Sequence, residues 1–256
     1  MKELLILQII AHLLADFIFQ TEKWCEEKEK KIFSRKLFIH TAIVLFFSLA
    51  LSFSFSFWWG ALLISVSHFL IDSAKSYLIK KKQLNKYLFF IDQSLHIIVI
   101  IMVVVLFAKS NSISDSFINS INNTFSPLFS EKIISFLDST KGLFIIFSFI
   151  FCIKPSNVLI KKVLELYDIS KTKNNKNDES LEKAGRIIGN LERFLTLFLI
   201  IFGQYNAVGF IIAAKSILRF RDSESNTEAK TEYLLIGSLM SFGIAILLGI
   251  FCKEII

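Results

Sequence analysis

Four histidines and three aspartates interrupt the apolar segments in the first 96 residues of this sequence. The chain has no other histidine, and three of the four have an aspartate four positions away: His12 with Asp16, His68 with Asp72, and His96 with Asp92. Because positions i and i+4 share one face of an α-helix, each pair presents an imidazole beside a carboxylate. An aspartate near the middle of a spanning helix costs about 2.5–3.5 kcal/mol, so these residues need a compensating partner.

The remaining histidine, His40, lies in another apolar segment. Counted along the predicted spans at 1.5 Å per residue, all seven residues lie within about 5–16 Å of one membrane boundary. Four antiparallel helices would therefore bring them into one layer. The predicted set of metal ligands is His12, Asp16, His40, His68, Asp72, Asp92 and His96.

Imidazole and carboxylate ligands together are typical of zinc and also suit manganese or iron, whereas calcium and magnesium sites seldom use several histidines. Seven ligands exceed the three or four that one zinc ion takes, so we expect one or two ions. A bound metal lowers the pKa of its water, and Asp16, Asp72 and Asp92 are the candidate catalytic carboxylates, as bridging ligand or base. Two other interpretations stay open: mutual neutralisation of buried polar groups, and conduction of protons or metal ions.

The same residues follow an internal repeat. The string HLLAD at His12–Asp16 is echoed by HFLID at His68–Asp72, 56 positions later, and His40 and His96 are separated by the same interval. This spacing predicts a duplicated helical hairpin around a pseudo-twofold axis along the membrane normal. The copies differ at Asp92, whose counterpart is Lys36.

The elements that position these residues follow from composition. The chain has 256 residues, of which 54% are hydrophobic and 20% charged, and its mean hydropathy is +0.58. The apolar residues form blocks of about 20, the length of a spanning helix, which excludes disordered, collagen-like, disulfide-scaffold and ordinary cytosolic classes. We predict an all-α, polytopic transmembrane bundle of about six spans: Leu4–Gln20, Leu37–Phe57, Trp58–Ile79, Tyr87–Ala108, Lys141–Ile153 and Leu234–Cys252.

Charge sets the predicted orientation. The net charge is +7, and basic residues gather in Thr21–Lys36, Lys75–Lys86 and Lys154–Arg193. Because basic loops stay in the cytoplasm, the N-terminus is predicted outside. The same bias explains the basic pI without nucleic acid, which we do not expect as a partner. The first apolar segment contains His12 and Asp16 and no clear cleavage site, so we interpret it as a retained span.

A further apolar segment, Phe194–Phe220, is interrupted at Gly203–Asn206. As two helices that turn back at this point, it would be a re-entrant hairpin and would keep Lys215 and Arg219 on the cytoplasmic side. As one span it would place both cations outside. We favour the hairpin.

The histidine segments resemble a bacterial family of membrane proteins, domain of unknown function 3307. The matching strings are AHLLADFIFQTEKW (Ala11–Trp24), His40, HFLIDSAK (His68–Lys75) and DQSLH (Asp92–His96). The pattern of intramembrane His and Asp is also similar to YdjM-type membrane-bound metal-dependent hydrolases. These resemblances imply metal binding and a bacterial inner membrane location.

Three polar residues accompany the predicted ligands in the first half of the chain. Gln20 and Gln93 are expected to orient metal-bound groups. Lys75 is either an anchor for a phosphate or carboxylate of the substrate, or a lysine that extends to the membrane boundary.

In the second half, Lys215 and Arg219 present two cations on one helix face. They would form a cradle for a headgroup or phosphate, or pair with Glu192 and Glu232, or anchor the helix by the positive-inside rule.

These observations predict four parts: a four-helix module with the His/Asp site (1–110), an outer loop with a fifth span (111–170), a polar linker (171–184) and a C-terminal membrane module (185–256). The predicted function is a metal-dependent hydrolase acting on an amphiphilic substrate, such as a phospho- or pyrophospho-lipid, near the cytoplasmic leaflet. The alternatives are a proton- or divalent-metal-conducting transporter and a membrane-anchored partner-binding protein. The lipid bilayer is an expected partner, and a homo-oligomer is a further expectation.

Overall fold

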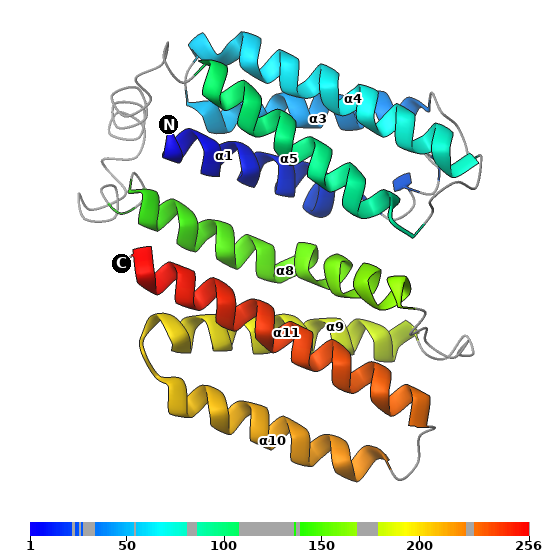
Figure 1. Cartoon of the computed structure of the whole chain (residues 1–256), viewed down its shortest axis with the longest axis vertical. Helices are drawn as coiled ribbons and strands as arrows, with labels where there is room; N and C mark the ends of the chain where they lie inside the picture. Colours follow the sequence, from blue (N-terminus) through cyan, green and yellow to red (C-terminus); the bar gives the residue numbers. More distant parts are fainter. Residues whose placement is uncertain are drawn as a thin grey trace. The chain divides into compact units, whose positions relative to one another are not determined.

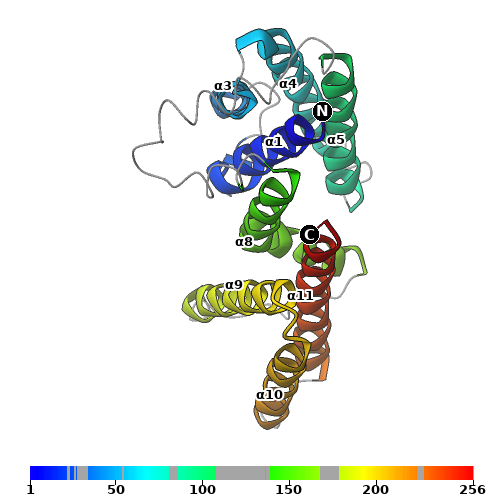
Figure 2. The same cartoon turned by 90° about the vertical axis from the view of Figure 1, so that its left-hand side faces the viewer.

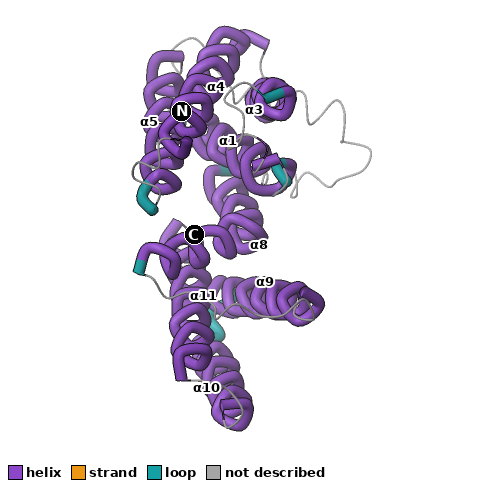
Figure 3. Tube along the Cα trace, turned by 90° about the vertical axis from the view of Figure 1, so that its right-hand side faces the viewer, coloured by secondary structure: helices purple, strands orange, loops and turns teal. Residues whose placement is uncertain are grey.

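The computed structural model describes residues 1–21, 24–25, 27, 34–53, 55–80, 86–107, 136, 139–167, 179–223 and 228–255. The regular elements of these residues are all helices, without a strand (Figure 3), which confirms the all-α prediction. The chain divides into two compact units, Met1–Phe147 and Ser148–Ile256. The outer loop and the linker predicted from sequence lie largely outside the described residues.

The helices of the first unit form a closed four-helix arrangement. In order they are α1 (Lys2–Leu13) with the π-helix η1 (Leu14–Phe19), α3 (Arg35–Ser52), the 3-10 helix η2 (Phe55–Phe57), α4 (Trp58–Lys80) and α5 (Leu88–Phe107). Both α1 and α4 pack against α3 and α5, and the two views in Figures 1 and 2 show these four helices grouped together. Each helix therefore has two neighbours toward which polar side chains can point.

Local signals define the ends of α3. The Ser34 hydroxyl accepts a hydrogen bond from the Leu37 N–H at 3.2 Å, the usual arrangement at a helix N-terminus. At the other end Phe53 adopts a left-handed conformation with φ of 48°, which stops the helix. The short connection through η2 then leads into α4, so α3 and α4 form a tight hairpin.

Polar contacts join the helices of the first unit. Gln8 Nε2 donates to the Ser48 carbonyl at 3.0 Å, and the Ser48 hydroxyl donates back to Gln8 Oε1. The Ser65 hydroxyl donates to the Thr41 carbonyl at 3.0 Å and so joins α4 to α3. Interhelical hydrogen bonds in membranes contribute about 0.6 kcal/mol each. Apolar packing around them involves Leu4, Val44, Phe57, Ile64 and Ile100.

The second unit contains most of α8 (Thr140–Leu166), which begins in the first unit, and α9 (Glu179–Ile201), α10 (Tyr205–Ser223) and α11 (Glu228–Ile255). Both α10 and α11 pack against α9. The predicted interruption of the apolar segment is present: α9 ends at Ile201, and Gly203 has φ of +72°, a conformation that glycine adopts without strain. Whether this helical hairpin re-enters a membrane stays a prediction.

Five described helices are long and apolar enough to cross a membrane: Arg35–Ser52, Trp58–Ile79, Leu88–Phe107, Thr140–Leu166 and Leu235–Glu254. An integral membrane protein is therefore indicated. The first predicted span, Leu4–Gln20, is covered by α1 and η1 but is not among these five. The count of six spans and the side of the N-terminus stay predictions.

Two predicted boundaries differ from the structure. The span predicted at Lys141–Ile153 belongs to a longer helix, because α8 continues through Pro155 to Leu166. Membrane helices tolerate an internal proline where other groups satisfy the freed backbone. The basic segment Lys154–Arg193, interpreted as a loop, is helical at both ends, and α9 begins inside the expected linker.

A buried arginine connects three helices of the second unit. Arg193 on α9 is only 2% exposed, and its guanidinium donates to acceptors on α8, α9 and α11. Two acceptors are backbone carbonyls just before Pro155, those of Cys152 (2.8 Å) and Ile153 (3.5 Å). The others are the side-chain oxygens of Asn157 and Asn190 (both 2.6 Å) and the Ser241 hydroxyl (2.8 Å).

Replacing Arg193 should destabilise the second unit. In Arg193→Ala, about five interhelical or intrahelical hydrogen bonds disappear at roughly 0.6 kcal/mol each, a loss of about 3 kcal/mol. Denaturant unfolding in detergent micelles, followed by circular dichroism, measures this loss. Arg186→Ala, which removes an exposed arginine from the same helix, should change stability by less than about 0.5 kcal/mol. Equal stability of the two variants would contradict the structural role of Arg193.

The close packing of α9 against α11 leads to a second prediction about stability. A Cβ atom at Gly249 would lie 2.6 Å from Ile200 Cγ2 and 2.7 Å from Ile200 Cβ, whereas nothing lies within 4 Å of a Cβ atom at Gly243. Gly249→Ala should therefore lower the free energy of unfolding by about 1–3 kcal/mol through overpacking. Gly243→Ala, on the same helix, should leave it unchanged or raise it slightly. Parallel unfolding of both variants in detergent checks the difference, and a harmless Gly249→Ala would show that the helices do not approach this closely.

Candidate metal centre

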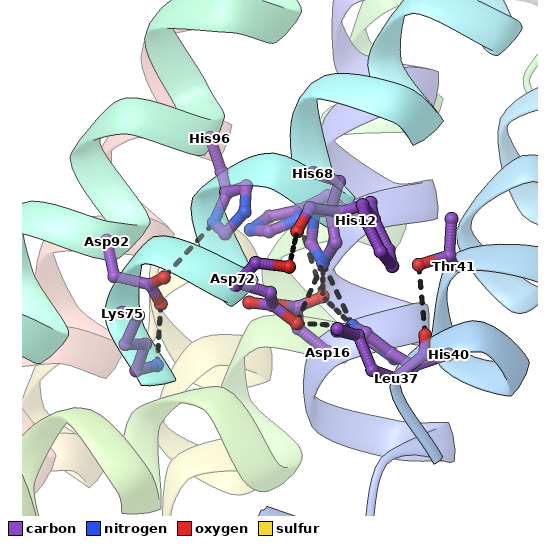
Figure 4. A network of polar contacts seen from close by, with 12 residues as sticks. His12, Asp16, Leu37, His40, Thr41, His68, Asp72, Lys75, Asp92 and His96 are labelled. Carbon is purple, nitrogen blue, oxygen red and sulfur yellow. Dashed lines mark hydrogen bonds and ion pairs between the residues drawn. The ribbon is translucent and has the colours of Figure 1, made fainter. Parts of the chain in front are cut away.

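The π-helix η1 places the first carboxylate. Asp16 lies in the middle of Leu14–Phe19, where the backbone continues α1 with wider turns. Such π-turns are rare and occur frequently at functional sites. The Asp16 side chain, 8% exposed, points into the space between the helices (Figure 4).

Asp16 meets two histidines from different helices. Its Oδ1 atom lies 3.3 Å from His40 Nε2 on α3 and 3.3 Å from His68 Nε2 on α4. The two imidazole nitrogens lie 2.9 Å from one another. Both histidines are almost completely buried, at 0% and 2% exposure. One oxygen and two nitrogens from three helical elements therefore form a small triangle.

Asp72 adds a fourth atom beside this triangle. Its Oδ2 atom lies 3.7 Å from His40 Nε2 and 3.9 Å from His68 Nε2. His68 and Asp72 are four residues apart on α4, so they lie on the same face of the helix, as predicted from the sequence. His40 provides the contact across to α3, which no spacing within one helix could show. We call Asp16, His40, His68 and Asp72 the inner group.

The spacing of the inner group fits a metal ion. A tetrahedral ion with ligands at about 2.0–2.2 Å separates neighbouring ligand atoms by about 3.3–3.6 Å. The triangle sides of 2.9, 3.3 and 3.3 Å lie within about 0.5 Å of this separation. Nitrogen and carboxylate oxygen are also the donor types that zinc, manganese and iron take. Asp16, His40 and His68 therefore fit a divalent ion in both spacing and chemistry, and Asp72 lies beside them.

The four imidazoles form one continuous cluster of rings. His68 stacks on His96 with ring centroids 3.9 Å apart and planes inclined by 26°. His12 lies against both of these rings, with centroid distances of 5.7 Å to His68 and 5.2 Å to His96. His40 completes the cluster, with its ring centroid 5.0 Å from that of His68.

Gln93 connects His12 to the carboxylates. His12 Nε2 lies 3.2 Å from Gln93 Oε1, and because an amide oxygen only accepts, the imidazole donates from this nitrogen. The opposite nitrogen, His12 Nδ1, lies 3.7 Å from Asp16 Oδ1. Gln93 Nε2 donates to Asp16 Oδ2 at 3.4 Å and to Asp92 Oδ2 at 3.2 Å. Gln93 therefore has the contacts expected of a residue that orients ligands.

The last part of the cluster joins Asp92, His96 and Lys75. Lys75 Nζ donates to Asp92 Oδ2 at 2.8 Å, and His96 Nδ1 lies 3.9 Å from Asp92 Oδ1 (Figure 4). Asp92 Oδ1 and both ring nitrogens of His96 are buried and have no hydrogen bond among the described residues. Together with Asp72, Asp92 and His96 form a further group whose ligand atoms lie within 4.8 Å of one another. We call this the outer group.

The predicted repeat is visible in the distances. The 56-residue interval relates the hairpin of α1 and α3 to the hairpin of α4 and α5. Under this relation His12 corresponds to His68, and His96 corresponds to His40. The centroid distance of 5.2 Å between His12 and His96 then corresponds to 5.0 Å between His68 and His40. Within each hairpin the histidine also lies near its aspartate, through Nδ1 at 3.7 Å for His12–Asp16 and through Nε2 at 3.9 Å for His68–Asp72. These distances agree with the repeat predicted from sequence, which stays a prediction.

The structure brings all seven predicted ligands into this cluster, together with Lys75 and Gln93. Gln20 is buried at the end of η1.

Lys215 lies in the second unit, where it forms an ion pair with Glu192 and lies 5.3 Å from the ring centroid of Phe242. The side chain of Arg219 is outside the described residues. The sequence-based search did not single out the polar network around Arg193, for which Arg193 and Asn190 within an apolar stretch were the available signal.

No curated protein and no solved structure matches the chain. The expected similarity to YdjM-type hydrolases therefore stays a prediction. A family model does match the part of the chain that contains the cluster. Residues 4–125 match the family described as Protein of unknown function (DUF3307), which supports the membership of this region in that family.

Proposed function

We propose that the protein is an integral membrane, metal-dependent hydrolase with an amphiphilic substrate. The observation that carries this proposal is the triangle of Asp16 Oδ1, His40 Nε2 and His68 Nε2, with sides of 2.9–3.3 Å. Mutual neutralisation needs only pairs of a histidine and an aspartate. It would also bring His40 and His68 to Asp16, but it does not require the two imidazole nitrogens to lie 2.9 Å from one another, as two ligands of one ion would.

The inner group would hold the ion. Asp16, His40 and His68 are the three protein ligands, as in many catalytic zinc sites that keep one position for water or substrate. Zinc is the ion that these donors suit best, with manganese or iron as alternatives. When bound, the ion would polarise an oxygen of the substrate and lower the pKa of a water molecule.

The remaining residues have separate roles in a hydrolytic step. Asp72 Oδ2, at 3.7–3.9 Å from the two imidazoles, would remove a proton from the attacking water. A bond forms between the water oxygen and phosphorus, and the bond to the leaving oxygen breaks. The proton taken up by Asp72 then passes to that oxygen. His12 and Gln93 hold Asp16 in position.

The surroundings favour a lipid-like substrate. Three of the helices around the cluster, α3, α4 and α5, are long and apolar enough to span a membrane, and its imidazoles are at most 4% exposed. A phospho- or pyrophospho-lipid brings its own apolar chain into such an environment, and its phosphate oxygens suit a divalent ion. We propose access from the cytoplasmic leaflet of a bacterial inner membrane, following the positive-inside rule.

Transport of a divalent ion is the second candidate. One observation favours it: three potential ligand groups overlap, because His68 belongs to two of them and Asp72 to two. An ion could move along such a series by exchanging one ligand at a time. A partner-binding protein, the third class, needs no metal.

Removing a ligand of the inner group should remove the metal. His68→Ala takes one vertex from the triangle, and we expect the zinc affinity of the purified protein to fall by more than 100-fold. Equilibrium dialysis followed by elemental analysis measures the bound zinc. The matched control is Ser67→Ala on the same helix, since the Ser67 hydroxyl bonds the carbonyls of Leu63 and Ile64 on α4. Zinc binding unchanged by His68→Ala would exclude the inner group as the metal site.

Reconstitution separates hydrolysis from transport. Zinc-loaded protein in vesicles that contain a prenyl pyrophosphate should release inorganic phosphate, and Asp72→Asn should slow this release by about 100-fold or more while zinc stays bound. A zinc-sensitive dye inside the vesicles reports ion flux in the same preparation. Zinc flux that depends on His68, without release of phosphate, would instead establish transport.

A further inference from the structure

We infer that the cluster binds a single divalent ion, because the ammonium group of Lys75 takes the place of a second one. This inference rests on the proposed metal site and determines how many ions it holds. The number of predicted ligands, seven, is compatible with either one or two bound ions. The contacts of Asp92 and the charges of the cluster decide between these numbers.

The outer group has the ligands for a second ion, but Lys75 already engages one of them. Asp72, Asp92 and His96 offer ligand atoms within 4.8 Å of one another. Asp92 Oδ2, however, accepts hydrogen bonds from Lys75 Nζ at 2.8 Å and from Gln93 Nε2 at 3.2 Å. Asp92 Oδ1 has no hydrogen bond among the described residues, but an ion bound there would share the carboxylate with the ammonium group and be repelled by it.

Charge balance gives the same answer. The contacts described for the cluster join three carboxylates, one ammonium and four imidazoles, which leaves a net charge of two negative when the imidazoles are neutral. One divalent ion neutralises this charge. A second ion would leave two uncompensated positive charges among apolar helices, where a buried charge without a partner is strongly unfavourable.

The repeat supports a special role for the Lys75–Asp92 pair. Counting back 56 positions, the counterpart of Lys75 is Phe19 and the counterpart of Asp92 is Lys36. The symmetric part of the cluster therefore contains four histidines and two aspartates, whose charge also matches one divalent ion. Lys75 and Asp92 are present together only in the second hairpin, where they add a pair with no net charge.

Lys75 is also a practical position for a test. Its side chain is 29% exposed, whereas Asp92 is 3% exposed, so Lys75 can be replaced without opening the centre of the cluster. Lys75→Met keeps the length and apolar stem of the side chain and removes only the charge and the donor. Lys75→Arg keeps the charge. Lys162→Met removes a lysine from the exposed ion pair with Glu165 and serves as the matched control.

The experiment is a cobalt and zinc titration of the full-length protein in detergent, read by visible absorption for cobalt and by elemental analysis for zinc. We expect one bound ion in the unaltered protein, in Lys75→Arg and in Lys162→Met. Lys75→Met should bind two ions, with the second binding step tightened by at least 100-fold. In the double variant Lys75→Met/Asp92→Asn, the second ion should be lost again, because its carboxylate ligand is gone.

The outcomes separate this inference from the proposed function. Two ions in the unaltered protein, or a single ion in a folded Lys75→Met variant, would overturn the role of Lys75 while the metal site itself remained. No bound ion in any variant would overturn the proposed function and this inference with it. A second ion that persists in the double variant would show that it binds elsewhere, which also overturns the inference.

Discussion

The burial of carboxylates among apolar helices is the constraint on which the first unit depends. A carboxylate removed from water is stable only when hydrogen bonds or opposite charges compensate it, and the lipid interior offers neither. Asp16, Asp72 and Asp92 can therefore be accommodated only where other helices present partners to them. The contacts of Asp16 with His40 and His68, from two other helices, meet this need and fix how α1, α3 and α4 pack.

Spacing along the sequence predicted which residues share the cluster but not how they pair. The i,i+4 rule places His12 beside Asp16, and the structure has this contact at 3.7 Å. The shorter contacts of Asp16, at 3.3 Å, cross to His40 and His68 on other helices, which spacing along the sequence does not show. The π-turn that contains Asp16 also has no signature in residue types. The Lys75–Asp92 pair was likewise invisible, because it joins different helices 17 positions apart.

Composition gave less guidance in the second unit. The basic character of Lys154–Arg193 suggested a cytoplasmic loop, yet Pro155 lies inside α8 and Arg193 lies inside α9. A residue's charge does not reveal whether neighbouring helices can satisfy it. At Arg193 they do so with amide, hydroxyl and carbonyl oxygens rather than with a carboxylate. Such neutral acceptors leave no charge pattern in the sequence, so the sequence does not show which residues Arg193 contacts.

The two hairpins differ at a few positions, and these differences make the two sides of the cluster unlike. Two equivalent hairpins alone would produce two equivalent ends, as the matching distances of 5.2 and 5.0 Å between histidine rings illustrate. Lys75, Asp92 and Gln93 have Phe19, Lys36 and Leu37 as their counterparts, so the charged and amide groups occur on one side only. That side also carries the partly exposed ammonium group. Because of these three differences, the ammonium group of Lys75 and the amide of Gln93 lie beside Asp92, at 2.8 and 3.2 Å, in the second hairpin.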